Sequence, residues 1–130
     1  MAGEKEYTQQ VATYYYRCKE PAFKIHFTDY KTAELAKYME NCFLALKVTF
    51  CCEFSDIAKQ FDVSYPELRE LFILDKRMGE SHTHVYPEQP YYDSHCLNKD
   101  IPGLLSFTRA PLMEAVHAIN IKKKLQHKYI

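Results

Sequence analysis

TDYKTAELAKYMENCFLALKVTFCCEFSDIAKQF, residues 28–61, contains neither proline nor glycine, and apolar residues occupy nearly every side of a helical wheel drawn over its middle. Such a run predicts one long helix that is buried on most of its faces. Thr28, Asp29 and Thr32 are the candidate N-caps, because a short polar side chain accepts a hydrogen bond from the first helical turn. This helix would be the centre of the fold.

Three polar residues interrupt the apolar pattern of the long helix. Glu34, Lys37 and Asn41 are spaced i, i+3, i+7, so they share one face. A buried lysine or asparagine without a partner costs on the order of 1–3 kcal/mol. The stripe is therefore either the helix's only solvated face, with a Glu34–Lys37 surface pair, or part of a site.

A short helix follows the long one. Ser64 and Glu67 match the capping box, and Pro66 falls within the first turn, where its missing N–H costs nothing. This helix should run to about Leu74.

The rest of the chain predicts a mainly α domain. Residues 76–95 contain two prolines and show no helical period, so they should form a long loop of the kind that is often functional. One or two further helices begin near Asp100, with Pro102 near the N1 position. In the ambiguous N-terminal part, QQVATYYYRC could be a helix and FKIHF a short strand.

Composition excludes several function classes. Among the 130 residues, 17 are basic and 17 acidic, so no overall positive field recruits nucleic acid or an anionic membrane. The three glycines form neither GxGxxG nor GxxxxGK, so the chain alone should not cradle a dinucleotide or a triphosphate. The local basic cluster, Lys122–Lys124 with Lys128, is expected to be a solvated helix face.

The location is expected to be the cytoplasm, or the host cytoplasm for a viral protein such as one from a phage. The chain has no run of 18 apolar residues and no apolar leader segment. Its five cysteines are odd in number, and three of them lie inside the long helical pattern, which favours reduced thiols. The tyrosines of Tyr14–Tyr16 and Tyr91–Tyr92 are expected in the core and its rim.

Cys96 allows three interpretations. It lies beside Lys99 and Asp100 near a predicted helix start, where a helix dipole and an ammonium favour a thiolate nucleophile. It could equally be a small apolar core residue. As a metal ligand it would need His82, His84 or His95, but the spacing of a zinc motif is absent.

Several blocks together resemble the UDP-glucose 6-dehydrogenase and GDP-mannose dehydrogenase family, in its central domain. TAELAKYMENCFLALKVTFCCEFSDIA is similar to the family's AELxKxxxNxFLAxKxxFxNE helix. LDKRMG and VYPEQPYYDSHCLNKDIPGLL are similar to its D-x-R-I-G and its Y-P-G-x-G-(F/Y)-G-G-S-C-F-P-K-D, and MEAVHAIN has a counterpart in the final helix. The resemblance covers about residues 28–121, and the order of the blocks makes it specific.

The resemblance implies a fold and a domain division. The fold would be mainly α, a long central helix plus shorter helices, like the C-terminal helical domain of 6-phosphogluconate dehydrogenases. Residues 1–27 would be a remnant of the last part of a Rossmann domain, and residues 28–130 the helical central domain.

The resemblance also implies a chemistry. In the family, a sugar C6 alcohol is oxidised to a carboxylate in two NAD-dependent hydride transfers, and a cysteine traps the aldehyde as a thiohemiacetal. Cys96 matches this nucleophile, Lys37 the lysine that stabilises oxyanion charge, Asn41 the neighbouring asparagine, and Asp100 the aspartate that positions water. The matching substrate-binding positions are Arg77, which would act across a dimer interface, Tyr86 and Lys99.

Departures from the family pattern leave two function classes open. Asp93-Ser94-His95 replace the paired glycines before the cysteine, and Glu88 and Pro90 replace those after Tyr-Pro, where the backbone would approach the nucleotide sugar. The chain could bind a nucleotide sugar, with NAD held only by a partner chain that supplies the Rossmann domain. It could instead be a non-enzymatic docking module. In both cases the long apolar helix favours a homodimer.

Overall fold

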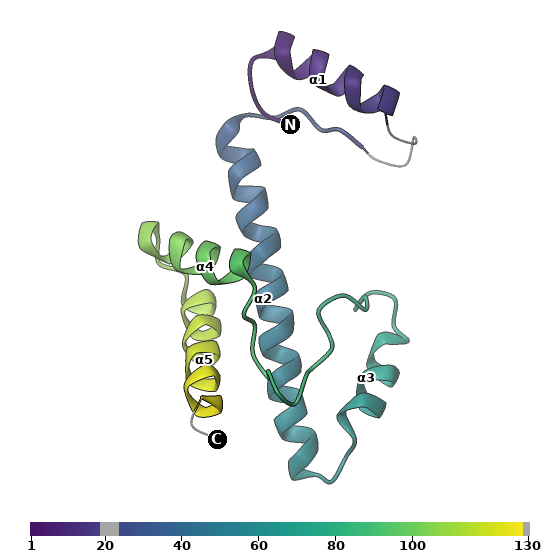
Figure 1. Cartoon of the computed structure of the whole chain (residues 1–130), viewed down its shortest axis with the longest axis vertical. Coiled ribbons are helices and arrows are strands. Elements are labelled where there is room, and N and C mark those ends of the chain that lie inside the picture. Colours follow the sequence, from purple (N-terminus) through teal and green to yellow (C-terminus); the bar gives the residue numbers. More distant parts are fainter. Residues whose placement is uncertain (19–23, 129–130) are drawn as a thin grey trace. The chain divides into compact units, whose positions relative to one another are not determined.

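The computed structural model describes residues 1–18 and 24–128, and its regular structure is helical (Figure 1). The five helices are α1 (Lys5–Cys18), α2 (Tyr30–Gln60), α3 (Tyr65–Ile73), α4 (His95–Phe107) and α5 (Pro111–His127). The predicted mainly α fold with a long central helix is confirmed. A strand over FKIHF is wrong for residues 24–27, which have no regular structure, and Phe23 lies outside the described residues.

The chain divides into two compact units, Met1–Met39 and Glu40–Ile130. In the first unit, the amino group of Met1 donates a 2.5 Å hydrogen bond to the carbonyl oxygen of His26, and the Thr28 N–H donates to the carbonyl oxygen of Met1 at 3.1 Å. These bonds tie the start of the chain to the segment that leads into α2. The domain division at residues 27 and 28 stays a prediction.

Helix α2 begins where a polar side chain caps it. The Thr32 N–H donates to Asp29 Oδ1 at 3.0 Å, and the Thr32 hydroxyl donates to Asp29 Oδ2 at 2.6 Å. Asp29 is thus the capping residue among the three candidates. At α3, Pro66 lies in the first turn as predicted, but the side chain of Ser64 makes no capping hydrogen bond, so the capping box is wrong in its side-chain part.

The core of the second unit joins α2, α4 and α5. Its buried members are Cys42, Ala45, Tyr92, Leu97, Ile101 and Val116. Partly buried leucines, a valine and a methionine from the same three helices pack around them. Tyr92 belongs to the loop before α4, so the loop's end is built into the core.

Helix α4 begins five residues earlier than the sequence indicated. Ser94 has extended backbone angles, and its hydroxyl accepts a hydrogen bond from the Leu97 N–H at 3.4 Å. Pro102 therefore lies inside the helix rather than near its N1 position. A proline removes one helical hydrogen bond, but the burial of Leu97 and Ile101 on the same helix offsets that loss.

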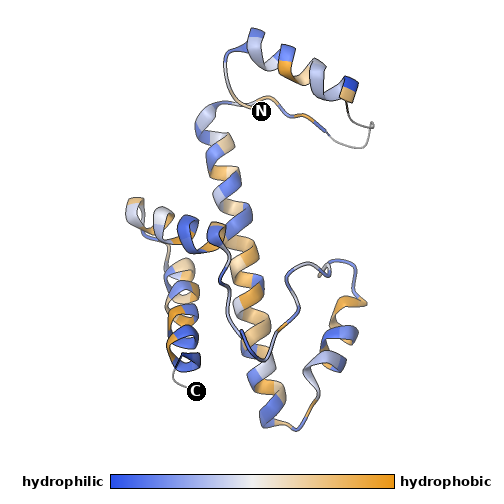
Figure 2. Ribbon diagram, in the orientation of Figure 1, coloured by the Kyte–Doolittle hydropathy of each residue, from blue (hydrophilic) through white to orange (hydrophobic). Residues whose placement is uncertain are grey.

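Helix α2 is less covered than predicted. Its middle is largely hydrophobic (Figure 2), yet several large apolar side chains on it are exposed: Phe43, Phe50, Phe54 and Ile57 in the second unit, with Leu35 and Met39 in the first. The expectation of burial on most faces is wrong, and so is the view of Glu34, Lys37 and Asn41 as the helix's only solvated face. The buried residues of α2 all lie in its second-unit part: Cys42, Ala45, Thr49, Cys51, Cys52, Ser55 and Ala58.

Two surface expectations also need correction. Lys123 was expected on a solvated face, but its side chain is mostly buried and forms an ion pair with Asp56 of α2. Tyr14, Tyr15 and Tyr16 are exposed on α1 rather than in a core. Within residues 1–18 and 24–128, no helix is long and apolar enough to cross a membrane.

Candidate active site

Cys96 lies in the first turn of α4, and its side chain is exposed. Lys99 and Asp100 follow at i+3 and i+4, a spacing that places all three on one side of a helix. The Ser94 cap fixes where this turn begins, because its hydroxyl and carbonyl oxygens accept the N–H groups of Leu97 and Asn98. The interpretation of Cys96 as a buried core residue is therefore wrong.

Asp100 is a buried carboxylate with a residue exposure of 2%. Asn41 Nδ2 of α2 donates a 2.5 Å hydrogen bond to Asp100 Oδ2, and Lys99 Nζ forms an ion pair with Asp100 Oδ1. A buried charge is tolerated only when it is paired and hydrogen-bonded. The structure thus joins Asn41, Lys99 and Asp100, three of the predicted site residues, in one cluster.

Cys42 lies beside this cluster but is not a second nucleophile. Burial raises the pKa of the Cys42 thiol, and the negative charge of Asp100 raises it further. A protonated, buried thiol is a poor nucleophile. The exposed thiol of Cys96 is the reactive candidate in this unit, since the other thiols of the unit, Cys51 and Cys52, are also buried.

A cavity of about 450 Å³ lies next to the start of α4. Its walls come from Val48 and Cys52 of α2, from loop residues between Ser81 and Asp93, and from Ser94 and Leu97. Burial raises the pKa of the Cys52 thiol to about 11, so this side chain is protonated at neutral pH. Ser94 and Leu97, which line the cavity, lie two residues before and one residue after Cys96. The volume of the cavity falls in the usual range for small-molecule sites.

The loop that lines the cavity is anchored at Thr83, which is fully buried. Tyr65 of α3 donates its hydroxyl proton to the carbonyl oxygen of Thr83 at 2.8 Å, and Arg69 Nε donates to Thr83 Oγ1 at 2.8 Å. The Thr83 hydroxyl in turn donates to the carbonyl oxygen of Glu80 at 2.7 Å. Helix α3 therefore holds the middle of the loop.

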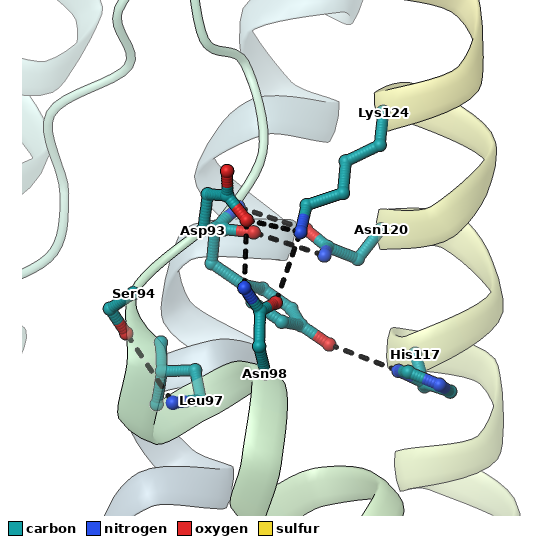
Figure 3. A network of polar contacts seen from close by, with 8 residues as sticks. Asp93, Ser94, Leu97, Asn98, His117, Asn120 and Lys124 are labelled. Carbon is teal, nitrogen blue, oxygen red and sulfur yellow. Dashed lines mark hydrogen bonds and ion pairs between the residues drawn. The ribbon is translucent and has the colours of Figure 1, made fainter.

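A second anchor lies at the loop's end, where α5 meets it (Figure 3). Asn120 hydrogen-bonds the backbone of Tyr92, and Asp93 accepts hydrogen bonds from Lys124 and from Asn98. These two donors, Lys124 first, lower the pKa of the Asp93 carboxyl. The residues just before the Ser94 cap are thus held from α5.

The remaining predicted residues lie apart from the Asp100 cluster or outside its unit. Tyr86 is exposed, lines the cavity and stacks on the ring of His84, with a centroid distance of 6.3 Å. Arg77 is exposed and pairs with Asp75 through Nε and Nη2. Lys37 is exposed on the part of α2 that belongs to the first unit. Their functional roles stay predictions.

Metal coordination finds no support in the described residues. No group of three or more histidine, cysteine, aspartate or glutamate side chains within 1–18 and 24–128 is placed to hold an ion. The His82 Nδ1 lies 2.5 Å from the hydroxyl oxygen of Ser81. The backbone of His82 has a positive φ of 63°.

Two structural residues of the site escaped the sequence analysis. Asn120 carried a signal, because it continues the i, i+3, i+7 face of Met113 and Val116 into the core and is a polar residue at an apolar position. Thr83 carried none, because a threonine in a loop is ordinary and its burial depends on α3.

Most of the chain is similar in sequence to known proteins. Residues 31–122 match the model of the UDP-glucose/GDP-mannose dehydrogenase family, central domain. UDP-glucose 6-dehydrogenase of Rhizobium meliloti is 32% identical over 103 residues, covering 75% of this chain and 23% of that protein. The Rickettsia felis enzyme of the same name is 33% identical over 85 residues, which cover 65% of this chain and 18% of that protein. GDP-mannose 6-dehydrogenase of Azotobacter vinelandii is 36% identical over 72 residues, which cover 55% of this chain and 16% of that protein.

The matches therefore concern one region of much longer proteins. The chain spans less than a quarter of the length of these relatives. The matched residues include Asn41, Cys96, Lys99 and Asp100, so the whole cluster lies within the family's central domain.

Proposed function

Because this chain belongs to the UDP-glucose/GDP-mannose dehydrogenase family, through its central domain, we propose that it binds a nucleotide sugar at the cavity beside α4 and presents the Cys96 thiol to it. The observation that carries this proposal is the buried Asp100 carboxylate, held by Asn41 and Lys99 at i+4 from an exposed thiol. A costly buried charge next to an accessible nucleophile is typical of reactive sites.

The chemistry follows from the residue types. The Cys96 sulfur adds to the carbonyl carbon of a sugar aldehyde, forming a C–S bond, while the carbonyl oxygen takes up a proton to give a thiohemiacetal. The Lys99 ammonium, paired with Asp100, lies at i+3 from the thiol and supplies positive charge at that end of the helix. Lys37 is the proposed stabiliser of the oxyanion, as its match to the family pattern implies.

Hydride transfer belongs, in this proposal, to a separate dinucleotide-binding unit. The described residues form five helices and no strand, and their glycines stand singly, so they offer no sheet edge and no glycine cradle for NAD. NAD would be held by a partner chain or by residues other than these. The five free cysteines fit a reducing compartment, which supports a cytoplasmic location.

A second candidate function is assembly, as a homodimer or a docking module. It is favoured by the apolar stripe of α2, defined as Phe43, Phe50, Phe54 and Ile57, which are spaced on one side of the helix and are all exposed. An exposed patch of large apolar side chains marks an interaction site. A second copy of the chain would cover the stripe on both partners at once.

Ligand binding is tested by thermal unfolding of the purified protein with UDP-glucose, GDP-mannose, UDP or NAD. A ligand at 100 times its dissociation constant stabilises a protein by about 2.7 kcal/mol, which is several degrees for a domain of this size. We expect a shift with a nucleotide sugar that is reduced in Asp100→Asn, whereas Cys18→Ala, a change at the other exposed thiol, retains it. Absence of any shift with the nucleotide sugars would refute the binding function.

Assembly is tested by light scattering after size exclusion. We expect a dimer mass that falls to a monomer mass in the double variant Phe50→Glu, Phe54→Glu. Phe107→Glu is the matched control, because Phe107 is even more exposed but lies on α4. A monomer mass for the unchanged protein would contradict the dimer.

A further inference from the structure

The side chain of Asn120 bridges both backbone groups of one residue. The Tyr92 N–H donates to Asn120 Oδ1 at 2.8 Å, and Asn120 Nδ2 donates to the Tyr92 carbonyl oxygen at 3.1 Å. Asn120 is buried on α5, with 3% of the residue exposed. A primary amide both donates and accepts, so the pair of bonds holds the peptide groups on both sides of the Tyr92 Cα.

Neighbouring residues of α5 hold the positions on either side of Tyr92. Lys124, one turn after Asn120, pairs with Asp93 and donates to Asn98 Oδ1 at 3.1 Å (Figure 3). The Lys124 ammonium also lies 5.8 Å from the ring centroid of Tyr91. One face of α5 thus contacts three consecutive residues of the loop.

Two residues separate Tyr92 from the first helical position of α4. Asp93 and Ser94 fill this interval, and Ser94 is the N-cap whose oxygens hold the Leu97 and Asn98 amides. A connection this short leaves little freedom between the hydrogen-bonded backbone of Tyr92 and the turn that carries Cys96.

We propose that Asn120 is a positioning residue for Cys96: its amide bridge to Tyr92 holds the backbone that leads into the Ser94 cap of α4, and so holds the thiol in place. The proposal rests on the proposed function only in taking Cys96 as the reactive group. Asn120 is not among the residues that line the cavity. It acts through the backbone of Tyr92 and the Ser94 cap.

Amide hydrogen exchange on the full chain tests this assignment without any ligand. The variants are Asn120→Leu, which removes both bonds, and Asn120→Asp, which keeps the shape and the acceptor but loses the donor when ionised. We expect protection of the Leu97 and Asn98 amides to fall at least tenfold at neutral pH in both variants. Protection of the Tyr92 amide should fall only in Asn120→Leu, because aspartate keeps the oxygen that accepts the Tyr92 N–H. If Asn120→Leu does not fold, the isosteric Asn120→Asp carries the test alone.

The Asn120→Asp variant supplies a rescue that general destabilisation would not. A protonated aspartate regains a donor, so protection of Leu97 and Asn98 should return towards the unchanged protein's level as the pH falls through the pKa of the new carboxyl. Val116→Ala, a change at a buried position on the same helix, is the control for lost packing and should leave the relative protection of these amides unchanged.

Unchanged protection of Leu97 and Asn98 in the Asn120 variants would overturn the proposal, and so would an equal loss in Val116→Ala. Titration of UDP-glucose into the same proteins separates this question from ligand binding. Lost protection in a protein that binds no nucleotide sugar would support the positioning role while refuting the proposed function. Retained protection in a protein that binds the nucleotide sugar would refute the positioning role while supporting the proposed function.

Discussion

The amide of Asn41 donates a 2.5 Å hydrogen bond to the buried carboxylate of Asp100, across 59 residues of sequence. This bond joins the long helix α2 to the helix that carries Cys96. Because the carboxylate is almost wholly removed from water, its charge depends on the Asn41 amide and the Lys99 ammonium for stabilisation. A polar bond therefore fixes the position of the two helices relative to each other at the proposed site, in addition to their apolar packing.

The Asn41–Asp100 bond should be measurable in a double-mutant cycle. Asn41→Ala removes a donor to a buried charge and should lower the free energy of unfolding by about 1–3 kcal/mol. Combined with Asp100→Asn, the cycle should give a coupling energy of about 0.5–3 kcal/mol in urea unfolding. Glu40→Ala, at an exposed neighbouring position, should change stability by less than about 0.5 kcal/mol. Additive effects of the two site changes would contradict the coupling.

The anchor at Thr83 predicts a selective effect of its hydroxyl. Thr83→Val keeps the shape but removes the acceptor for Arg69 Nε, a group on a buried side chain. The free energy of unfolding should fall by about 1–3 kcal/mol. Thr83→Ser retains the hydroxyl and should lose less, as measured by the same urea titration. If valine and serine cost the same, the hydrogen bonds are not what holds the loop.

Thr49 predicts a stabilising change. It is buried on α2, and its hydroxyl oxygen has no hydrogen-bond partner among the described residues. Valine has nearly the same shape and avoids the cost of burying an unpaired hydroxyl, so Thr49→Val should raise the free energy of unfolding by about 1 kcal/mol. Thermal unfolding measures the gain in stability. The control is Thr13→Val, a change at an exposed position of α1. A fall in stability would show that the hydroxyl is paired in solution.

Stability should decline at alkaline pH because of Cys52. Its folded-state pKa is raised to about 11 by burial, whereas an unfolded thiol ionises near 8.5–9. The resulting stability is complete below the unfolded pKa and is lost as the pH rises from there through the folded pKa. Between pH 8 and pH 10, the unchanged protein should lose about 1 kcal/mol more than Cys52→Ala in urea unfolding. Parallel losses in the two proteins would exclude this thiol as the cause.

The long helix could be predicted from sequence because its signal is local. A stretch without proline or glycine, capped by Asp29, forms Tyr30–Gln60 within a residue or two of the predicted limits. The start of α4 could not, because proline near a helix start is a common pattern and pointed to Pro102. The Ser94 cap and the burial of Leu97 against other helices decide the start instead.

The candidate site shows the same division between local and distant causes. Cys96, Lys99 and Asp100 are close in sequence, so their proximity could be predicted. Their shared helical side could not, because the helix was expected to begin near Asp100 and α4 begins at His95. The burial of Asp100 and its bond to Asn41 depend on the packing of α4 against α2, which no local pattern contains. The anchors Thr83 and Asn120 depend on α3 and α5 in the same way.

The cavity loop is held at Thr83 and Tyr92, whereas several of the side chains that it presents to the cavity lie between these two residues. The span between these anchors, residues 84–91, holds His84 and Tyr86 against the cavity while its two ends are secured by bonds that its own side chains do not make. Loops on a rigid scaffold are where binding properties change with least damage to the fold. We therefore expect that a different sequence grafted between the two anchors would change the cavity wall without unfolding the helices that carry it.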